Sequence, residues 1–496
     1  MKGFMRYELK NGVEYASVYT ARRVEGRKIN EVKYLGKVID KTNGIFVNRK
    51  RGVFSFSIEA GYGEDVPEVS IADPRIERMI LDFGDSFFIG KILEECGMED
   101  VLRRVFPGRI QSLLALLMFK IAGNHSNSHA QDWWEGSYAR VLFPKAKLQS
   151  QRISELLREL GEEEFQRSFF AAYLSSMRTE RPKHSVLIDS TGLPNDIHFP
   201  LTAVNTHNGV TSQEVRLILV LDKTTKKPLF FRYVAGNIVD VTTLRTTIDE
   251  LKLLGVEVDF AILDAGYYCE DNIMELQESH ISYLTRLRPN LTLYKELVRE
   301  HVDDLEHAKY MTKYRDRLIH IKRVEVSLFD ATAYAYIAMD FDRRCDEIKK
   351  YAVAALDDKN ITDLEIDAVI KSKGFFAMIS SEAIDPKEIL PLYYTRQAIE
   401  QVFDFAKNSV DLIPLRVHGE EAFRGHLMLS FIASVVFIAF NQRLDGTRFN
   451  AGGAAHVLRN LKCKVYDKSA LVLEPNKKMN DIAKHLKIKI PRVIDL

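Results

Sequence analysis

Four polar side chains within residues 393–407 have the types and the spacing to act together on a charged substrate. They are Tyr393, Arg396, Glu400 and Lys407. At about 100° per residue, a helix would place all four within an arc of roughly 60°. One face of that helix would then carry an aromatic hydroxyl, two cations and a carboxylate. The same spacing also fits an ordinary amphipathic surface helix, so the choice depends on the rest of the chain.

Two aspartates far upstream end apolar segments and add two more carboxylates. Asp189 closes the β-branched run in SVLIDSTG (185–192), and Asp264 closes the run in VDFAILDAGYY (258–268). Each run is short, apolar and followed by turn residues, which is typical of a buried strand. Taken singly, each aspartate also fits a turn residue at a strand end. With Glu400 they make three carboxylates on three separate elements.

The elements that would position these carboxylates follow a regular order. In chain order we predict a strand in 185–192 that ends on Asp189, strands 215–222 and 227–234, helix 241–255, a strand in 258–268 that ends on Asp264, helix 270–278, strand 281–287 and, much later, strand 374–381. The polar turn KTTKK would join the second and third strands as a hairpin. The 135 residues between Asp264 and Glu400 are too many for a loop and predict an inserted subdomain.

The spacing Y-x2-R-x3-E-x6-K, read here at Tyr393, Arg396, Glu400 and Lys407, resembles the signature of bacterial and archaeal insertion-sequence transposases of the DDE type. The resemblance extends over about residues 186–441. Two further similar motifs are G-N-x2-D (Gly236, Asn237 and Asp240) and D-x-G-Y (Asp264, Gly266 and Tyr267).

The resemblance implies an α/β fold, with an RNase H-like mixed-sheet catalytic core that carries a β-rich insertion, plus N-terminal β-rich and α-helical modules. We therefore divide the chain into a basic β-rich module (1–70), an α-helical module for DNA binding or dimerisation (75–180), the catalytic core (183–287 and 374–444), the inserted β-containing subdomain (288–373) and a basic C-terminal region (445–496).

The resemblance also implies roles for the site residues. Asp189, Asp264 and Glu400 would be the catalytic and metal-binding carboxylates, holding two divalent ions, Mg²⁺ or Mn²⁺. Asp189 would bridge both ions, while Asp264 and Glu400 would each bind one. Tyr393, Arg396 and Lys407 would contact the DNA backbone near the cut.

One departure from the family concerns the insertion. Some relatives stack a flipped base on a tryptophan there, but residues 288–373 contain no tryptophan. Either a tyrosine such as Tyr314, Tyr334 or Tyr336 takes that place, or a flipped base is held in another way.

Charge and composition agree with a protein that acts on DNA. Residues 1–60 carry thirteen Lys and Arg against six Asp and Glu, and residues 451–496 carry ten against four. Two basic ends on a chain of net charge +1 suit a polyanion, although a solvated surface explains them equally well. Four scattered cysteines and a polar N-terminus predict a cytoplasmic, nucleoid-associated protein without a membrane partner.

These features together predict a transposase that cuts insertion-sequence ends and joins the freed 3′ hydroxyls to target DNA. Its partners would be the terminal inverted repeats, the target duplex and a second copy of the chain, because two ends must be held together. Three alternatives stay open: an RNase H-like nuclease that cuts without joining, a catalytically silent DNA-binding regulator, and a glycosidase with paired carboxylates. The glycosidase leaves the basic ends unexplained.

Overall fold

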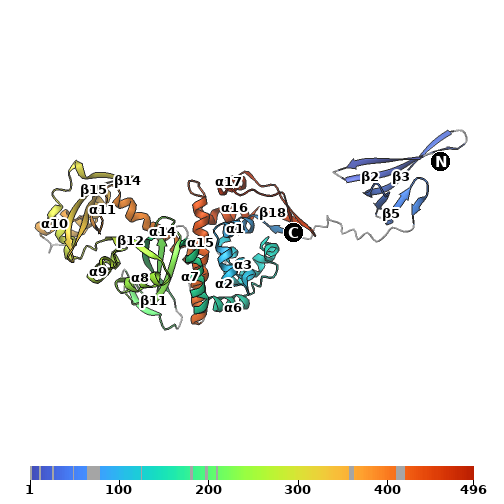
Figure 1. Ribbon diagram of the computed structural model, residues 1–496. Coiled ribbons are helices and arrows are strands. Elements are labelled where there is room, and N and C mark those ends of the chain that lie inside the picture. The colour runs from blue at the N-terminus through green and yellow to red at the C-terminus, as the bar shows by residue number, and fades with distance from the viewer. Residues whose placement is uncertain are drawn as a thin grey trace. The chain divides into compact units, whose positions relative to one another are not determined.

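A computed structural model describes the protein over residues 3–10, 13–24, 27–48, 50–63, 79–123, 126–178, 183–195, 199–207, 210–238, 240–356, 362–408 and 419–496. The chain forms two compact units, Met1–Ile76 and Glu77–Leu496. The second unit contains all the predicted site residues (Figure 1).

The first unit is a six-stranded antiparallel sheet in the order β1-β2-β3-β4-β5-β6. Its strands are β1 (Gly3–Lys10), β2 (Val13–Val24), β3 (Arg27–Asp40), β4 (Ile45–Asn48), β5 (Gly52–Ser57) and β6 (Gly61–Gly63). Alternate residues of these strands form a small apolar cluster around Leu35, Phe46 and Phe54. The predicted β-rich N-terminal region is therefore confirmed.

The second unit is built on a ten-stranded mixed sheet. One end of this sheet runs β11-β10-β8-β12-β13, with β8, β12 and β13 parallel and the other pairs antiparallel. These elements are β8 (Lys183–Pro194), β9 (Ala203–His207), β10 (Val210–Asp222), β11 (Pro228–Ala235), 3-10 helix η2 (Asp240–Thr243), α8 (Leu244–Leu253), β12 (Glu257–Leu263), 3-10 helix η3 (Ala265–Tyr267), α9 (Glu270–Glu278) and β13 (Ser282–Arg286). Apart from β9, a strand that the sequence analysis did not predict and that pairs with β10, this is the predicted order, and the α/β fold with a mixed sheet is confirmed.

The segment 288–373 does not form a sheet of its own. Its strands continue the main sheet beyond β13 in the order β17-β16-β15-β14. The elements are α10 (Thr292–His301), 3-10 helix η4 (Ala308–Tyr310), β14 (Met311–Tyr314), β15 (Arg317–Leu328), β16 (Ala331–Asp340), α11 (Phe341–Leu356), α12 (Asp363–Lys371) and the returning strand β17 (Phe375–Ser380). Backbone pairing through β17 joins this segment to the core.

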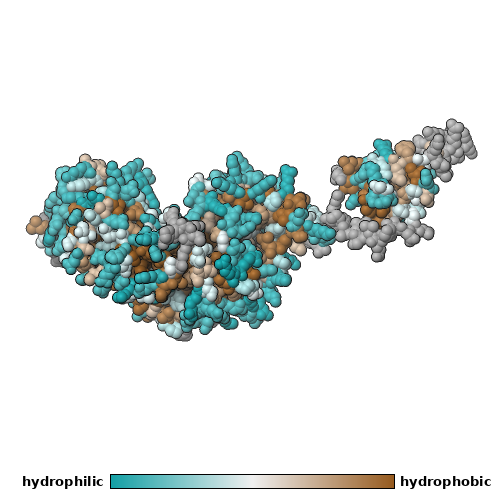
Figure 2. All heavy atoms as spheres, in the orientation of Figure 1, coloured by the Kyte–Doolittle hydropathy of each residue, from teal (hydrophilic) through white to brown (hydrophobic). Residues whose placement is uncertain are grey.

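A long apolar helix, α15 (Glu420–Arg443), lies between the main sheet and the remaining helices (Figure 1). It is the one helix among the described residues that is long and apolar enough to cross a membrane, but 83% of its most apolar window is buried inside the protein. Gly425 allows α15 to pack closely, because a Cβ there would lie 1.7 Å from the Leu157 carbonyl oxygen. The helix is a core element of the unit, whose visible surface is mostly hydrophilic (Figure 2).

The helical segment before β8 packs together with the C-terminal segment. The helical segment consists of β7 (Met79–Asp82), α1 (Gly84–Glu95), α2 (Met98–Val105), α3 (Ile110–Ala122), 3-10 helix η1 (Asn127–His129), α4 (Ala130–Gly136), α5 (Ala139–Leu142), α6 (Ser150–Leu160) and α7 (Glu163–Arg178). The C-terminal segment consists of α16 (Ala451–Arg459), β18 (Lys462–Val465), β19 (Ser469–Val472), α17 (Lys477–Leu486) and β20 (Val493–Asp495). Strand β7 completes a four-stranded sheet with β18, β19 and β20, so the two segments share one structure.

The helix predicted over residues 393–407 is interrupted. Helix α13 (Ile389–Tyr393) is followed by the 3-10 helix η5 (Tyr394–Arg396) and then by α14 (Gln397–Asn408). Thr395 donates its hydroxyl to the Leu392 carbonyl at 2.7 Å, a local bond that competes with regular helical pairing. Of the four residues predicted to share one helix face, Tyr393, Arg396, Glu400 and Lys407 (the stripe residues), only Glu400 and Lys407 lie on α14. The apolar face of α14 is buried.

Candidate active site

Strand pairing brings the two predicted aspartates together. Strands β8 and β12 are parallel neighbours, and their mutual pairing ends at Ile188 and Leu263. Asp264 directly follows β12, as predicted, but Asp189 lies within β8 and not at its end, because β10 pairs with β8 as far as Pro194. Since each aspartate is the residue after a paired one on a parallel neighbour, both carboxylates lie side by side where β12 ends.

A single guanidinium connects the two carboxylates. Arg396 donates from one nitrogen to Asp189 Oδ2 and from the other to Asp264 Oδ1, both at 2.7 Å. It also donates to the Tyr393 hydroxyl at 2.9 Å. Asp189 accepts a further bond from the backbone N–H of Ser190 at 2.8 Å. Arg396 is therefore part of the acidic cluster, and the sequence did not predict this contact.

Burial and charge act on these groups in opposite directions. Burial raises the pKa of Asp189, although the Arg396 guanidinium counteracts the rise. Burial would by itself lower the pKa of Arg396, but Asp189, Tyr393 and Asp264 together raise it well above its usual range. Burial raises the pKa of Tyr393 to about 12. Arg396 therefore stays charged and Tyr393 stays protonated near neutral pH.

Glu400 lies on the same helical segment but outside this cluster. It is one helical turn beyond Arg396 on α14, with an exposed side chain. It makes no hydrogen bond or ion pair with any residue that the structure describes. Within the same described ranges, no group of three His, Cys, Asp or Glu side chains is close enough to hold a metal ion. The structure thus joins two of the three predicted carboxylates.

Lys407 lies two turns further along α14 and faces the same strand as Asp189. Its ammonium donates to the Thr191 hydroxyl at 2.5 Å. Burial lowers the pKa of Lys407, while the carboxylates of Asp404 and Glu214 act to raise it. A cation is thereby held beside the D-S-T-G segment of β8.

Comparison with known proteins places this arrangement in a family. The family described as the transposase DDE domain matches residues 181–436, just over half of the 496-residue chain. The chain belongs to the DDE transposase family. This match confirms the transposase predicted from the sequence and contains Asp189, Asp264, Glu400 and the other three stripe residues.

No curated protein matches the chain. Among solved structures, it is similar to a cryo-EM structure of piggyBac transposase in a synaptic complex with hairpin DNA. The sequence identity is 12% and the TM-score 0.37, and the match covers 76% of this chain and 70% of that chain.

The transposase has a further buried carboxylate that the sequence analysis missed. Glu214 of β10 is 6% exposed and accepts a hydrogen bond from the Asn205 amide at 2.5 Å. Gly192 of the D-S-T-G motif makes room for the carboxylate, because a Cβ there would lie 2.3 Å from Glu214 Oε2. Gly236 of the G-N-x2-D motif lets the neighbouring backbone approach, because a Cβ there would lie 2.1 Å from the Glu214 backbone carbonyl oxygen. Glu214 lies in a strand whose polar and apolar residues alternate in the ordinary way. Only these two glycines could therefore have indicated a buried carboxylate at this position.

The β14–β15 hairpin of the transposase reaches the start of α14. Tyr314 stacks on Tyr394 with ring centroids 5.2 Å apart, and Arg315 donates to the Gln397 side chain at 2.6 Å. Tyr336, in contrast, is fully buried and donates its hydroxyl to the Ile384 carbonyl. Tyr336 therefore has no face open to a base, whereas Tyr314 lies beside the segment that carries Arg396.

Proposed function

We propose that this DDE transposase acts on an insertion sequence, cutting its ends and joining the freed 3′ hydroxyls to target DNA. The observation that carries the proposal is the convergence of Asp189 and Asp264 on one cation, the Arg396 guanidinium, at 2.7 Å each. Two carboxylates from adjacent parallel strands that already bind one positive charge suit a binding site for a further cation. Asp189, Asp264 and Glu400 are the proposed catalytic residues.

The two aspartates that lie together, Asp189 and Asp264, supply the oxygen donors that divalent metal ions prefer, and Glu400 would have to approach them to complete the set. Oxygen ligands from a few carboxylates suffice for Mg²⁺, which keeps several of its waters, and Mn²⁺ accepts the same donors. Asp189, Asp264 and Glu400 would hold two such ions. When bound, the ions would activate the attacking water or hydroxyl and neutralise charge on the leaving oxygen.

The chain's own cations would position the substrate. Arg396 neutralises two carboxylates, and an incoming metal ion would compete with it for them. Once released, its guanidinium can pair with a DNA phosphate, for which its flat, forked donor set is well suited. Lys407 and the Tyr393 hydroxyl supply further donors on the same segment, so these three residues are the proposed contacts with the DNA backbone.

The proposed partners follow from this chemistry. They are the terminal inverted repeats of the element, the target duplex and a second copy of the chain, because joining both ends at one target requires both to be held together. The reaction would take place on DNA in the cytoplasm.

Incubation of the full chain with a labelled duplex that carries the element's own end, supercoiled plasmid and Mg²⁺ tests this function. We expect the labelled strand to become joined to the plasmid through its 3′ end, and Asp264→Asn to abolish both cutting and joining. Asp249→Asn, which removes an exposed carboxylate from α8, is the matched control. Cutting without joining would instead indicate a nuclease, and binding without cutting a silent regulator.

A further inference from the structure

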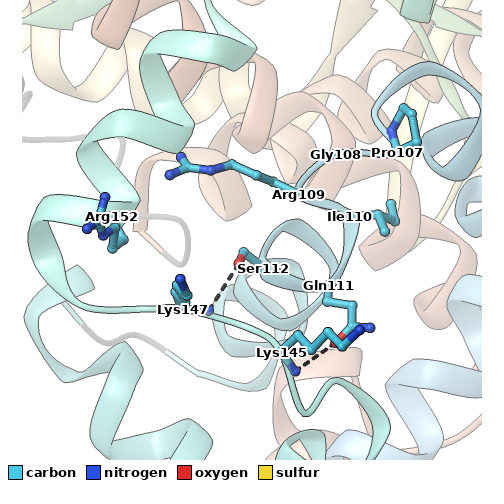
Figure 3. A pocket seen from close by; sticks show the side chains of 9 residues that line it. All are labelled: Pro107, Gly108, Arg109, Ile110, Gln111, Ser112, Lys145, Lys147 and Arg152. Carbon is cyan, nitrogen blue, oxygen red and sulfur yellow. Dashed lines mark hydrogen bonds between the residues drawn. The ribbon is translucent and has the colours of Figure 1, made fainter.

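A basic pocket lies in the second unit, far along the chain from the aspartates. Its volume is about 690 Å³, and it lies between the start of α3, the segment 143–148 and the start of α6 (Figure 3). Among the described residues that line it, the charged ones are all cations: Arg109, Lys145, Lys147 and Arg152. The pocket is a candidate for an anionic ligand.

The first turn of α3 holds the two lysines in place. The Gln111 side chain accepts the backbone N–H of Lys145 at 2.8 Å, and the Ser112 hydroxyl accepts that of Lys147 at 3.0 Å (Figure 3). Ala146 is buried between the two exposed lysines, so both lysine side chains extend from the same side of the segment. Neither lysine has an acidic partner within the described ranges.

Two glutamates behind the pocket orient its arginines. Glu155 accepts from Arg109 and from Arg152, both at 2.9 Å, and Glu159 lies 3.1 Å from Arg109. The hydrogen bonds from Arg109 and Arg152 lower the pKa of Glu155, which therefore stays ionised. A guanidinium has more N–H donors than these bonds use, so both arginines keep donors for a ligand. Counting the glutamates, the cluster retains a net positive charge supplied by the lysines.

The packing of the neighbouring helices shows which kind of contact with a nucleic acid is possible at the pocket. Helices α6 and α7 follow each other with a short turn at Gly161, as the two helices of a helix-turn-helix do. However, the aromatic side chains of α7 are buried, with Phe170 packed against Phe230 of β11 and Phe431 of α15. This helix is therefore a core element and cannot enter a major groove as a recognition helix does. Contact through the sugar-phosphate backbone requires only exposed cations, which the pocket provides.

From these observations we infer that the basic pocket is a second DNA-binding site, which holds backbone phosphates of a duplex independently of base sequence. Its volume exceeds that of one phosphate, and its cations come from three separate segments of the chain. The inference rests on the proposed function for the identity of the polyanion, since a transposase must hold DNA beyond the bond that it cuts.

The test compares Lys145→Glu/Lys147→Glu with Lys252→Glu/Lys349→Glu, a matched variant that removes two exposed lysines from α8 and α11. Affinity of the full chain is measured by fluorescence anisotropy over a KCl series. The probes are a duplex with the element's end and a scrambled duplex of equal length. We expect the pocket variant to bind both duplexes roughly tenfold or more weakly, and its log–log salt slope to fall by about 2. The control variant should stay within about twofold of the wild type.

Equal affinity and equal slope for the pocket variant and the control would overturn the inference. If the substitutions to glutamate prevent folding, Lys145→Gln/Lys147→Gln is compared with the control variant in the same binding assay. Cutting of the end duplex by the wild-type chain is scored separately. Wild-type cutting with unchanged binding by the pocket variant would refute the pocket alone, and lost binding without wild-type cutting would refute the proposed function alone.

Discussion

At the scale of single residues, the site depends on Arg396. One guanidinium compensates Asp189 and Asp264, and the side chains of Arg396 and Asp189 are only 12% and 13% exposed. Removing one partner from such a cluster leaves poorly hydrated charges without compensation, which costs more than the pair itself contributes. The guanidinium therefore stabilises this site, and it would compete with a metal ion bound as proposed for the same oxygens.

Arg396→Gln tests this double role. In EDTA, we expect the free energy of unfolding to fall by about 2–4 kcal/mol, because the two carboxylates then repel each other. Mg²⁺ or Mn²⁺ should stabilise the variant more than it stabilises the wild type, since no cation then competes with the metal. Urea denaturation with and without metal measures both effects, and Arg288→Gln, at an exposed arginine, is the control. An equal metal effect in variant and wild type would show that Arg396 does not compete.

The sequence predicted the residues of this site better than their contacts. Asp189, Asp264 and Arg396 were singled out from residue type and spacing, and the structure brings these three together. The spacing could not show that Arg396 pairs with the aspartates, because that contact depends on how η5 packs against β8 and the end of β12. Glu214 was missed because its burial depends on the close approach of Gly192 and Gly236, which have no side chains.

At the scale of elements, the β10–β11 hairpin shows how one carboxylate fixes a turn. Asp222 accepts hydrogen bonds from the backbone N–H groups of Thr224 and Thr225, and its other oxygen lies 2.9 Å from His184 Nδ1. Burial alone would raise the pKa of Asp222, but the bonds from His184 and Thr225 outweigh it and lower this pKa to about 2. The hairpin turn thus depends on an ionised carboxylate.

This shift predicts a dependence of stability on pH. The folded pKa of about 2 lies below the ordinary value of 3.8, so the contribution of Asp222 is complete above pH 3.8 and is lost as pH falls towards 2. We expect Asp222→Asn to be less stable than the wild type by about 2 kcal/mol near pH 6, with the difference shrinking below pH 4. Urea denaturation across this range measures it. Asp249→Asn should follow the wild-type profile, and a pH-independent difference for Asp222→Asn would contradict the assignment.

The order of core elements could be predicted because each has a clear period or a clear end. Helix α9 and the hairpin of β10 and β11 occur where the pattern placed them. The interruption at η5 could not be predicted, because Thr395 is compatible with a regular helix. The hydrogen bond from its hydroxyl to the Leu392 carbonyl, which favours the 3-10 turn, is visible only in the structure. The pairing of the inserted strands with the main sheet could not be predicted from the sequence either, because the periodicity of a strand does not identify its partner strand.

At the scale of the whole molecule, a buried ion pair connects the C-terminal segment to the helical segment. Arg459 of α16 donates to Asp85 of α1 at 3.0 Å and to the Ala122 carbonyl of α3 at 2.9 Å. Asp85 is fully buried, and burial raises its pKa while Arg459 counteracts the rise. Residues almost four hundred positions apart in the chain therefore depend on each other.

Removing this cation should weaken the whole second unit. We expect Arg459→Ala to lower the free energy of unfolding by about 3–5 kcal/mol, because it leaves Asp85 buried without its cation. Thermal and urea unfolding of the full chain measure the loss. Arg158→Ala, at an exposed arginine of α6, should change stability by less than about 1 kcal/mol. Similar small effects for both variants would show that the pair does not hold the two segments together.

The most direct test of the account concerns Glu400, the proposed catalytic carboxylate that stands apart from the other two. The measurement is cutting of a labelled duplex carrying the element's own end, in Mg²⁺, by the wild type, Glu400→Gln and Asp404→Asn. Asp404 is an exposed acid one turn further along α14, so it controls for loss of charge on the same helix. We predict that Glu400→Gln binds the duplex but cuts it at least about a hundredfold more slowly, whereas Asp404→Asn cuts like the wild type. Equal cutting by all three would contradict the assignment of Glu400 and with it the proposed three-carboxylate site.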